Sequence, residues 1–394
     1  MIIQETVEQQ ALRAEVREYL SGFMNSSVRA ELIQGGDASP LYLELIRKMG
    51  RDGWLGVGLP KKYGGKGLSP LEQYIFFNEV RRAGTPYNLV TVNTVAPAIA
   101  THGTESQQER FLPGILSGDL QVSIGYTEPE AGTDLAALKT RAVRDGDHYV
   151  VNGQKVFTSR AQVADYIWLA CRTDPSARKH KGITILMVPT SAPGYACTPT
   201  PTLGFTTTST FYEDVRVPAE NVIGTENEGW RLIMSQLNHE RVSIPAQAGL
   251  AERLWEEVHA WTKEPSPDTG KRPTDEPWVR AELARSYARL QATRLLNWQM
   301  VTRLAAGELA PADASVVKVS GSESMQDIYR TLLAIIGPSS YLPSGSPGAF
   351  LAGELEFVAR ESQMYTFGGG TNEIQREIIA WRGLGVVREA GGVR

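Results

Sequence analysis

The sequence predicts a mostly helical protein with a central β domain, and two observations carry that prediction. Apolar residues recur at three- and four-residue spacing before residue 121 and again after residue 227, as on amphipathic helices. Between them lie short runs rich in β-branched and aromatic residues, separated by turn signals. Helices and strands come in blocks and do not alternate, which disfavours a doubly wound sheet. We therefore expect an N-terminal helical domain (1–120), a middle β domain (121–227) and a C-terminal helical domain (228–394).

The N-terminal domain is expected to contain several amphipathic helices. One begins after Ser69, a suitable N-cap residue that is followed by Pro70 at the first helical position. The predicted helices cover residues 5–20, 40–50, 70–83 and 105–117.

The middle domain is expected to consist of short strands. The dipeptides Asp145-Gly146 and Asn152-Gly153 are strong turn signals and predict turns between strands. The predicted strands cover residues 121–125, 149–151, 166–170, 183–188 and 210–217.

Long helices are expected again in the C-terminal domain. Pro245 lacks an N–H for the carbonyl of Arg241, so a kink is expected within the first of them. Residues 264–276 are rich in proline and predict a loop. The predicted helices cover residues 229–262, 276–306, 310–336, 349–365 and 371–384.

Composition narrows the classes of partner and compartment. The 394 residues carry 40 basic and 44 acidic side chains, a formal net charge of -4, which favours neither nucleic acid nor an anionic membrane as a general partner. Cys171 and Cys197 are the two cysteines, so a zinc site or a disulfide framework is not expected. The first ten residues lack the pattern of a signal peptide, and residues 83–104 are too polar for a membrane span. These features favour the cytoplasm.

The segment from Tyr126 to Asp134 carries the clearest chemical signal. It reads Tyr-Thr-Glu-Pro-Glu-Ala-Gly-Thr-Asp and follows a predicted strand. Pro129 ends ladder pairing, and Gly132 permits close approach of the backbone to a flat group. Hydroxyls and free N–H groups at such a strand exit can bind the edge of a heteroaromatic ring. The alternative is an ordinary polar strand-to-loop transition.

Two further segments support a functional interpretation of residues 126–134. Residues 152–159 read Asn-Gly-Gln-Lys-Val-Phe-Thr-Ser, and residues 371–376 read Thr-Asn-Glu-Ile-Gln-Arg. Together, in this order and spacing, the three segments resemble the acyl-CoA dehydrogenase family over essentially the whole chain. The resemblance implies bound FAD. It implies Tyr126 and Thr127 at the flavin pyrimidine edge, and Gly132 and Thr133 near the flavin and the thioester. It implies Phe157 and Ser159 at the flavin face, and Thr371 and Glu373 at the pyrophosphate.

The family reaction removes an α-proton from an acyl-CoA while a hydride leaves the β-carbon for flavin N5. It needs a carboxylate base and donors to the thioester oxygen. Many relatives hold the base near the C-terminus, where this chain has Gly369. Others hold it directly before an Arg on the first helix after the β domain, where this chain has Glu240. The resemblance therefore implies Glu240 as base, Gly369 as a backbone donor, and Asn238 and Arg241 near the CoA chain. The alternative for Glu240 is an ordinary surface carboxylate.

Two family signatures that serve the adenosine diphosphate half of a neighbour's FAD are degraded here. They would lie at residues 271–278 and 334–341. With these two signatures degraded, the chain resembles one subunit of the heterotetrameric acyl-CoA dehydrogenases of bacterial steroid side-chain degradation. This resemblance implies a second, different subunit, a steroid CoA thioester as substrate and an electron-transfer flavoprotein as acceptor. The alternatives are a non-catalytic structural subunit, and a flavin monooxygenase or oxidase of the same fold.

Overall fold

A computed structural model describes residues 4–240, 248–267 and 269–386, without the side chains of residues 237–240. The chain divides into two compact units. The first comprises residues 1–34, 69–85 and 242–394, and the second comprises residues 35–68 and 86–241. In the described ranges, no helix is both long enough and apolar enough to cross a membrane.

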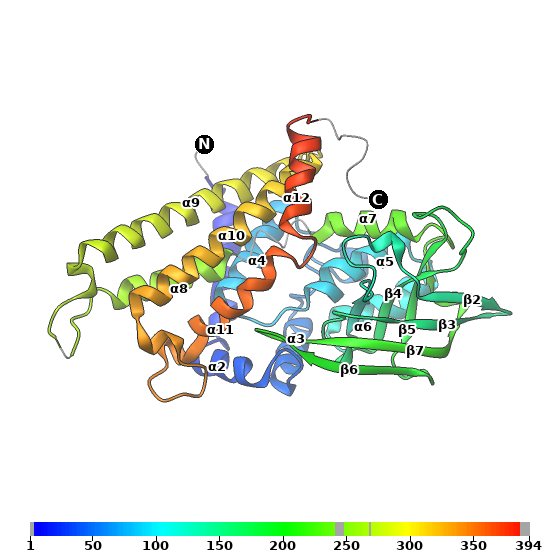
Figure 1. The fold of residues 1–394 in the computed structure, drawn as a ribbon, viewed down its shortest axis with the longest axis horizontal. Coiled ribbons are helices and arrows are strands. Elements are labelled where there is room, and N and C mark those ends of the chain that lie inside the picture. Colours follow the sequence, from blue (N-terminus) through cyan, green and yellow to red (C-terminus); the bar gives the residue numbers. More distant parts are fainter. Residues whose placement is uncertain (1–3, 241–247, 268, 387–394) are drawn as a thin grey trace. The chain divides into compact units, whose positions relative to one another are not determined.

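The first unit is helical (Figure 1). Its longest helices, α9 and α10, pack along each other, and α10 also contacts α8, α11 and α12. Their contacts form an apolar core that includes Leu254, Leu332 and Leu355, each fully buried. The helices are α1 (Val7–Ser21), α2 (Ser26–Gly35), α4 (Pro70–Ala83), α8 (Ala248–Trp261), α9 (Pro277–Ala305), α10 (Pro311–Ile336), α11 (Glu354–Glu361) and α12 (Asn372–Ile378).

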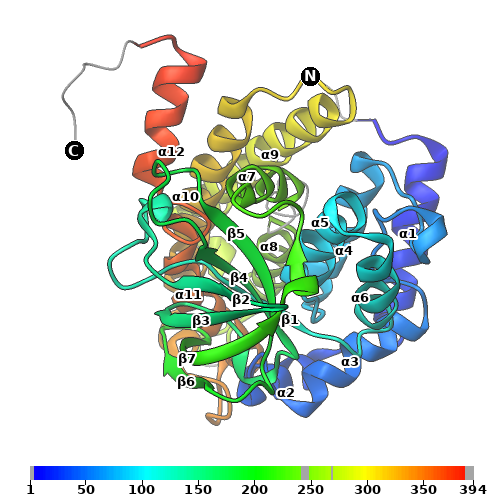
Figure 2. The same cartoon turned by 90° about the vertical axis from the view of Figure 1, so that its right-hand side faces the viewer.

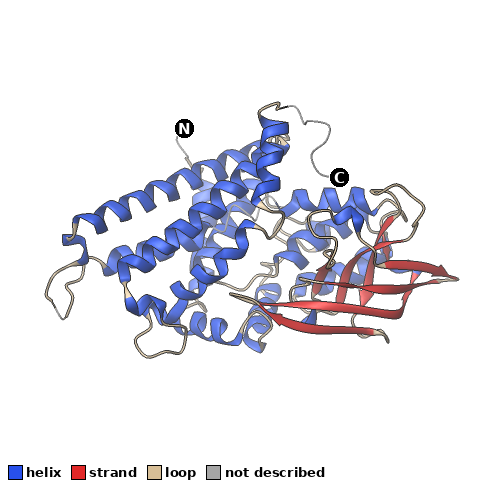
Figure 3. Ribbon diagram, in the orientation of Figure 1, coloured by secondary structure: helices blue, strands red, loops and turns tan. Residues whose placement is uncertain are grey.

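The second unit holds every strand of the described residues (Figure 3). The sheet order is β6-β7-β3-β2-β4-β5-β8, and β1 pairs with β4 in parallel. Helix α7 packs against β5 (Figure 2). The strands are β1 (Val122–Gly125), β2 (Arg141–Asp145), β3 (His148–Lys155), β4 (Tyr166–Arg172), β5 (Ile183–Pro189), β6 (Tyr195–Pro201), β7 (Thr206–Pro218) and β8 (Val222–Ile223). The helices are α3 (Pro40–Arg51), a π-helix (Val90–Val95), α5 (Ala96–His102), α6 (Glu105–Ser117) and α7 (Gly229–Glu240).

The predicted fold class, helices around a central β block, is confirmed. The N-cap prediction is confirmed as well, because the Ser69 hydroxyl accepts from the backbone N–H of Glu72, whose carboxylate accepts from the N–H of Ser69. The Asp145-Gly146 turn is confirmed, since Asp145 pairs with His148 across a hairpin and Gly146 has a φ of 62°.

The predicted turn at Asn152-Gly153 is wrong. Both residues lie within β3, where the pairing with β7 shifts register between Val151 and Gly153. This is a β-bulge, and glycine is needed because a Cβ at Gly153 would lie 2.5 Å from the Thr140 hydroxyl. The Asn152 side chain bonds to Asp214 across the bulge.

One predicted C-terminal helix is also wrong in form. Within residues 349–365, the α-helix α11 covers only eight residues, and a short 3-10 helix lies on each side of it. Leu351 and Ala352 adopt left-handed backbone conformations, with φ of 48° and 54°, which break the helix before α11. The predicted kink at Pro245 lies outside the described residues.

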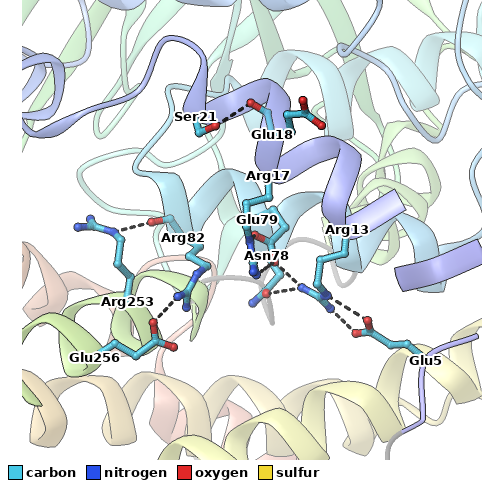
Figure 4. A network of polar contacts seen from close by, with 10 residues as sticks. All are labelled: Glu5, Arg13, Arg17, Glu18, Ser21, Asn78, Glu79, Arg82, Arg253 and Glu256. Atoms are coloured by element: carbon cyan, nitrogen blue, oxygen red, sulfur yellow. Dashed lines mark hydrogen bonds and ion pairs between the residues drawn. The ribbon is translucent and has the colours of Figure 1, made fainter. Parts of the chain in front are cut away.

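A network of arginines around the buried Glu79 carboxylate joins α1 to α4 in the first unit (Figure 4). Glu79 on α4 is 2% exposed and accepts from both Arg13 Nη1, at 2.6 Å, and Arg17 Nε, at 2.9 Å. Arg13 also donates to Glu5 and to the Asn78 side chain. A buried carboxylate therefore fixes the docking of α1 through two cations.

We expect Glu79→Ala to lower the free energy of unfolding by about 2–3 kcal/mol, because it removes the hydrogen bonds of Arg13 and Arg17 to a buried carboxylate, while Arg13 keeps its ion pair with Glu5. Urea unfolding followed by helical circular dichroism measures the effect. Glu256→Ala is the matched control, because the Glu256 side chain pairs with Arg82 but is 54% exposed, and its loss should cost less than about 1 kcal/mol. Equal costs for the two variants would contradict a structural role for the network around Glu79.

Candidate active site

Tyr126 and Thr127 directly follow β1 and begin a tight loop in the second unit. Glu128 and Ala131 close this loop with a reciprocal pair of backbone hydrogen bonds, each 3.1 Å long, around Pro129. The Thr127 carbonyl accepts from the backbone N–H of Val156 at 2.9 Å, which places the loop beside the end of β3. Two of the three sequence motifs therefore meet in space.

A buried ion pair holds this junction together. Lys155 is fully buried, and its Nζ donates to Glu128 Oε1 at 2.8 Å and to the Tyr126 carbonyl at 2.9 Å. The Glu128 carboxylate also accepts the backbone N–H groups of Lys139 and Thr140. Burial alone would raise the pKa of Glu128, but the Lys155 ammonium and these hydrogen bonds hold it below its ordinary value. The pair shapes the backbone at Tyr126 and Thr127.

Phe157 lies two residues after the end of β3, and its exposed aromatic ring is carried by a strained backbone. Its φ is 58°, a left-handed value that is uncommon for a bulky residue, and it is 67% exposed. Ser159 stands two residues on, fixed by its carbonyl, which accepts from the Ser123 hydroxyl at 2.8 Å. Arg160 is left-handed as well, with a φ of 62°. Such strain persists where the surroundings enforce it, and it clusters at functional sites.

The predicted glycine and threonine of the loop are exposed. A Cβ at Gly132 would meet only the Thr127 methyl, at 3.8 Å, so the backbone there is open on its other side. Thr133 is exposed beside it. The second unit therefore gathers Tyr126, Thr127, Phe157 and Ser159 around one strand exit, with Gly132 and Thr133 on the same loop.

Gly369 lies in the first unit, in the segment Gly368-Gly369-Gly370. Its φ is 70°, that of Gly370 is 98°, and a Cβ at Gly369 would meet no atom within 4 Å. Its backbone N–H has no partner among the described residues. Gly369 therefore has an open backbone N–H and no side chain to act as a base, and its role as a donor to the thioester oxygen stays a prediction. The predicted residues Thr371 and Glu373 follow: Thr371 caps α12 with its hydroxyl, and Glu373 is exposed in the first turn.

Helix α10 holds this glycine segment from both sides. Before the glycines, Lys318 Nζ donates to the Tyr365 carbonyl and Gln326 Nε2 donates to the Ser362 carbonyl at 3.0 Å. After them, Ser322 bonds to Asn372. The Ser315 hydroxyl donates to Gln375 at 2.7 Å, and Arg376 pairs with Glu323 at 2.6 Å.

Lys318 was missed by the sequence reasoning. Burial lowers its pKa to about 8, and no carboxylate in the described residues pairs with it. Its one sequence signal is a lysine within the apolar run Val316-Val317-Lys318-Val319 of a predicted helix. A lysine on the buried side of such a helix needs an acceptor, here the backbone that leads into the glycines.

The predicted base lies at the end of α7. Glu240 is the last residue of this helix, and Asn238 is two residues earlier. The side chains of both are outside the described part of the chain, as is the whole of Arg241. The assignments of Glu240 as base and of Asn238 and Arg241 as CoA contacts therefore stay predictions.

At the positions of the two degraded FAD signatures, the chain makes local turns and hydrogen bonds with itself. Residues 271–278 form a 3-10 turn (Pro273–Asp275) before α9. At the end of α10, Ser340 is buried, and its hydroxyl donates to the Leu333 and Gly337 carbonyls at 2.9 and 2.7 Å. A side chain of the chain itself thus occupies the helix end.

The second unit fits a flat cofactor. An exposed phenylalanine ring on enforced, strained backbone suits stacking on a planar ring system. Beside it, the Thr158 hydroxyl is buried and has no hydrogen-bond partner among the described residues. When bound at this strand exit, FAD would be held by Phe157, Ser159 and the backbone of Tyr126 and Thr127.

Comparison of the sequence with known proteins identifies its family. Sequence models of the acyl-CoA dehydrogenase N-terminal, middle and C-terminal domains match residues 6–119, 123–215 and 227–384. Acyl-CoA dehydrogenase FadE26 of Mycobacterium tuberculosis is 47% identical over 98% of this chain and 99% of its own length.

Solved structures of the same family have the same fold. The chain is 50% identical to a subunit of the Tcur3481-Tcur3483 steroid ACAD, with a TM-score of 0.94 and coverage of 99% of this chain and 100% of that one. It is 46% identical to a subunit of the ChsE4-ChsE5 complex from Mycobacterium tuberculosis, with a TM-score of 0.92 and coverage of 98% and 100%. The predicted resemblance is therefore confirmed. This chain belongs to the acyl-CoA dehydrogenase family and is an oxidoreductase whose cofactor is FAD.

Proposed function

We propose that this chain is the base-bearing subunit of a hetero-oligomeric acyl-CoA dehydrogenase that oxidises the CoA thioester of a steroid with a shortened side chain. The observation that carries the proposal is the pairing of Gly369, which has no side chain, with a carboxylate at Glu240. When bound, FAD supplies the acceptor for the β-hydride.

The chain's own residues have three tasks in this reaction. Glu240 removes the α-proton, the open N–H of Gly369 donates to the thioester oxygen as negative charge develops there, and Asn238 and Arg241 bind the CoA chain. A backbone donor suits this task because it costs no side-chain ordering in the transition state. The loop from Tyr126 to Thr133 and the segment from Phe157 to Ser159 orient the flavin.

The partner and the substrate rest on two supports. The relatives named as a Tcur3481-Tcur3483 steroid ACAD and as a ChsE4-ChsE5 complex are assemblies of two different chains. In this chain, the helix end at Ser340 and the loop at residues 271–278 lack the family's residues for the adenosine diphosphate half of a neighbour's FAD. A different subunit would complete that half. We further propose an electron-transfer flavoprotein as acceptor and the cytoplasm as compartment, and the three-domain division at residues 120 and 227 stays a prediction.

The proposal is tested by co-expressing the chain with the product of a neighbouring acyl-CoA dehydrogenase gene. The purified assembly should contain two kinds of subunit and fewer FAD molecules than subunits, by mass and by absorbance. With an artificial electron acceptor, it should convert a steroid CoA thioester to the α,β-unsaturated product. A homotetramer of this chain with one FAD per subunit would refute the divided cofactor site. Rapid reaction of the reduced flavin with oxygen would favour an oxidase or monooxygenase.

A further inference from the structure

Three side chains of the second unit, a half-buried tyrosine between two buried residues, form a directed chain of hydrogen bonds. Trp168 on β4 donates from Nε1 to the Tyr126 hydroxyl at 3.0 Å. The Tyr126 hydroxyl in turn donates to Oε1 of Gln236 on α7. Trp168 is 0% exposed and Gln236 is 1% exposed. The chain therefore runs from the sheet through the predicted flavin loop to the helix that carries Glu240.

The order of donors in this chain fixes the orientation of the Gln236 carboxamide. An indole N–H can only donate, so the Tyr126 oxygen accepts from Trp168 and its hydrogen is directed to Gln236. A carboxamide presents its oxygen to an incoming donor, which leaves Nε2 on the other side. The network thus fixes the two N–H donors of Gln236 on the side of the carboxamide away from the Tyr126 hydroxyl.

Gln236 Nε2 is buried and has no hydrogen-bond partner among the described residues. Leaving such a donor unsatisfied costs stability, because its hydration is lost on burial. A bound ligand that supplies the acceptor would remove this cost. Position 236 lies one helical turn before Glu240, and residues four apart share one face of a helix.

We propose that Gln236 Nε2 donates a hydrogen bond to an oxygen of the bound acyl-CoA, and that the Trp168–Tyr126–Gln236 chain positions it for that purpose. The proposal rests on the proposed function, because it takes the Glu240 face of α7 as the substrate side. The acceptor is either a hydroxyl or ketone oxygen of the acyl group or a carbonyl of the thioester and pantetheine arm. A fixed donor on this face selects for a ligand with oxygen at that position.

Gln236→Met tests the proposal, because methionine has a similar size and no donor. The FAD-loaded protein, co-expressed with its partner subunit, is titrated with two CoA thioesters, and the dissociation constants are read from the visible spectrum of the flavin. Deoxycholoyl-CoA carries ring hydroxyls, and 5β-cholanoyl-CoA carries none. We expect about tenfold weaker binding of at least one of them. A loss confined to deoxycholoyl-CoA identifies an acyl oxygen, and an equal loss for both identifies the thioester and pantetheine arm.

Stability separates this role from a structural one. Gln236→Met removes the unsatisfied Nε2 donor together with the Oε1 that accepts from the Tyr126 hydroxyl, so it should lower the melting temperature less than a variant that removes a fully bonded glutamine. Gln107→Met is the matched control. Gln107 is buried too, but its Nε2 donates to the Glu220 and Val222 carbonyls at 2.6 and 2.7 Å, so its loss should lower the melting temperature without weakening ligand binding.

Two results would overturn the proposal. One is unchanged affinity of Gln236→Met for both thioesters, and the other is loss of bound FAD from this variant, which would assign Gln236 to support of the flavin loop through Tyr126. Because binding and not turnover is measured, an inactive Glu240 variant or a wrong assignment of the base would leave this test intact. The two failures are therefore distinguishable.

Discussion

Glu240→Gln should abolish turnover of every acyl-CoA substrate while FAD stays bound. The amide keeps the size of the side chain but cannot accept the α-proton. General base catalysis contributes about 10²–10⁴-fold to rate, and Gly369 offers no substitute carboxylate. Rapid mixing of the FAD-loaded assembly with substrate measures the rate of flavin bleaching. The loss should fall on kcat and kcat/KM together, because the base acts in the transition state.

A matched variant removes a carboxylate elsewhere in the chain. Glu377 is exposed on α12, and Glu377→Gln should bleach at the wild-type rate. Wild-type activity of Glu240→Gln would refute the assignment of the base and support a structural subunit, with the essential carboxylate in the partner. Exchange of the substrate α-proton with deuterated solvent gives an independent reading, and it should vanish in Glu240→Gln.

Lys155→Met should destabilise the second unit by about 3–5 kcal/mol and release FAD, because it leaves the Glu128 carboxylate buried without its cation. It also removes the donor to the Tyr126 carbonyl at the predicted pyrimidine edge. Thermal unfolding and retained flavin absorbance measure the two effects. The double variant Lys155→Met with Glu128→Gln should recover part of the stability, since no buried charge remains. A single variant as stable as the wild type would contradict the role of this pair.

The same pair predicts a pH dependence. The pKa of Glu128 is lower in the folded protein than in the unfolded chain, so the unfolded chain binds the proton more tightly. The stability from this carboxylate is present above its ordinary pKa and is lost as pH falls through the lowered value. In the Lys155→Met and Glu128→Gln double variant, the fall in melting temperature on acidification should be shallower. An identical acid profile would mean that other carboxylates control acid unfolding.

The sequence predicted the block order of the fold and most long elements because their signals are local. Ser69, Pro70 and Glu72 form a cap within one helical turn, and α9 and α10 match their expected ranges within one residue. The π-helix Val90–Val95 was missed, since its run Val-Thr-Val-Asn-Thr-Val is rich in β-branched residues and nearly all buried, which removes the amphipathic period. Strand β6 was missed because Pro199 and Pro201 lie in it, tolerated at the end of the sheet order.

The candidate site was predictable where it rests on motifs and not where it rests on long-range contacts. Tyr126, Phe157 and Ser159 were identified by their segments, and the structure brings them to one strand exit. Gln236 and Lys318 gave no such signal. Gln236 has a buried, unpaired donor, and Lys318 on α10 donates to a backbone carbonyl of the turn before Gly369. Both facts depend on residues far away in the chain.

The glycine at position 369 also limits how this protein can evolve. Its φ of 70° is a conformation in which any side chain is strained, although the space around it is open. A mutation to glutamate would therefore need backbone rearrangement before a base could act there. A carboxylate base at position 369 is therefore not within reach of one substitution, and we expect this position to remain glycine.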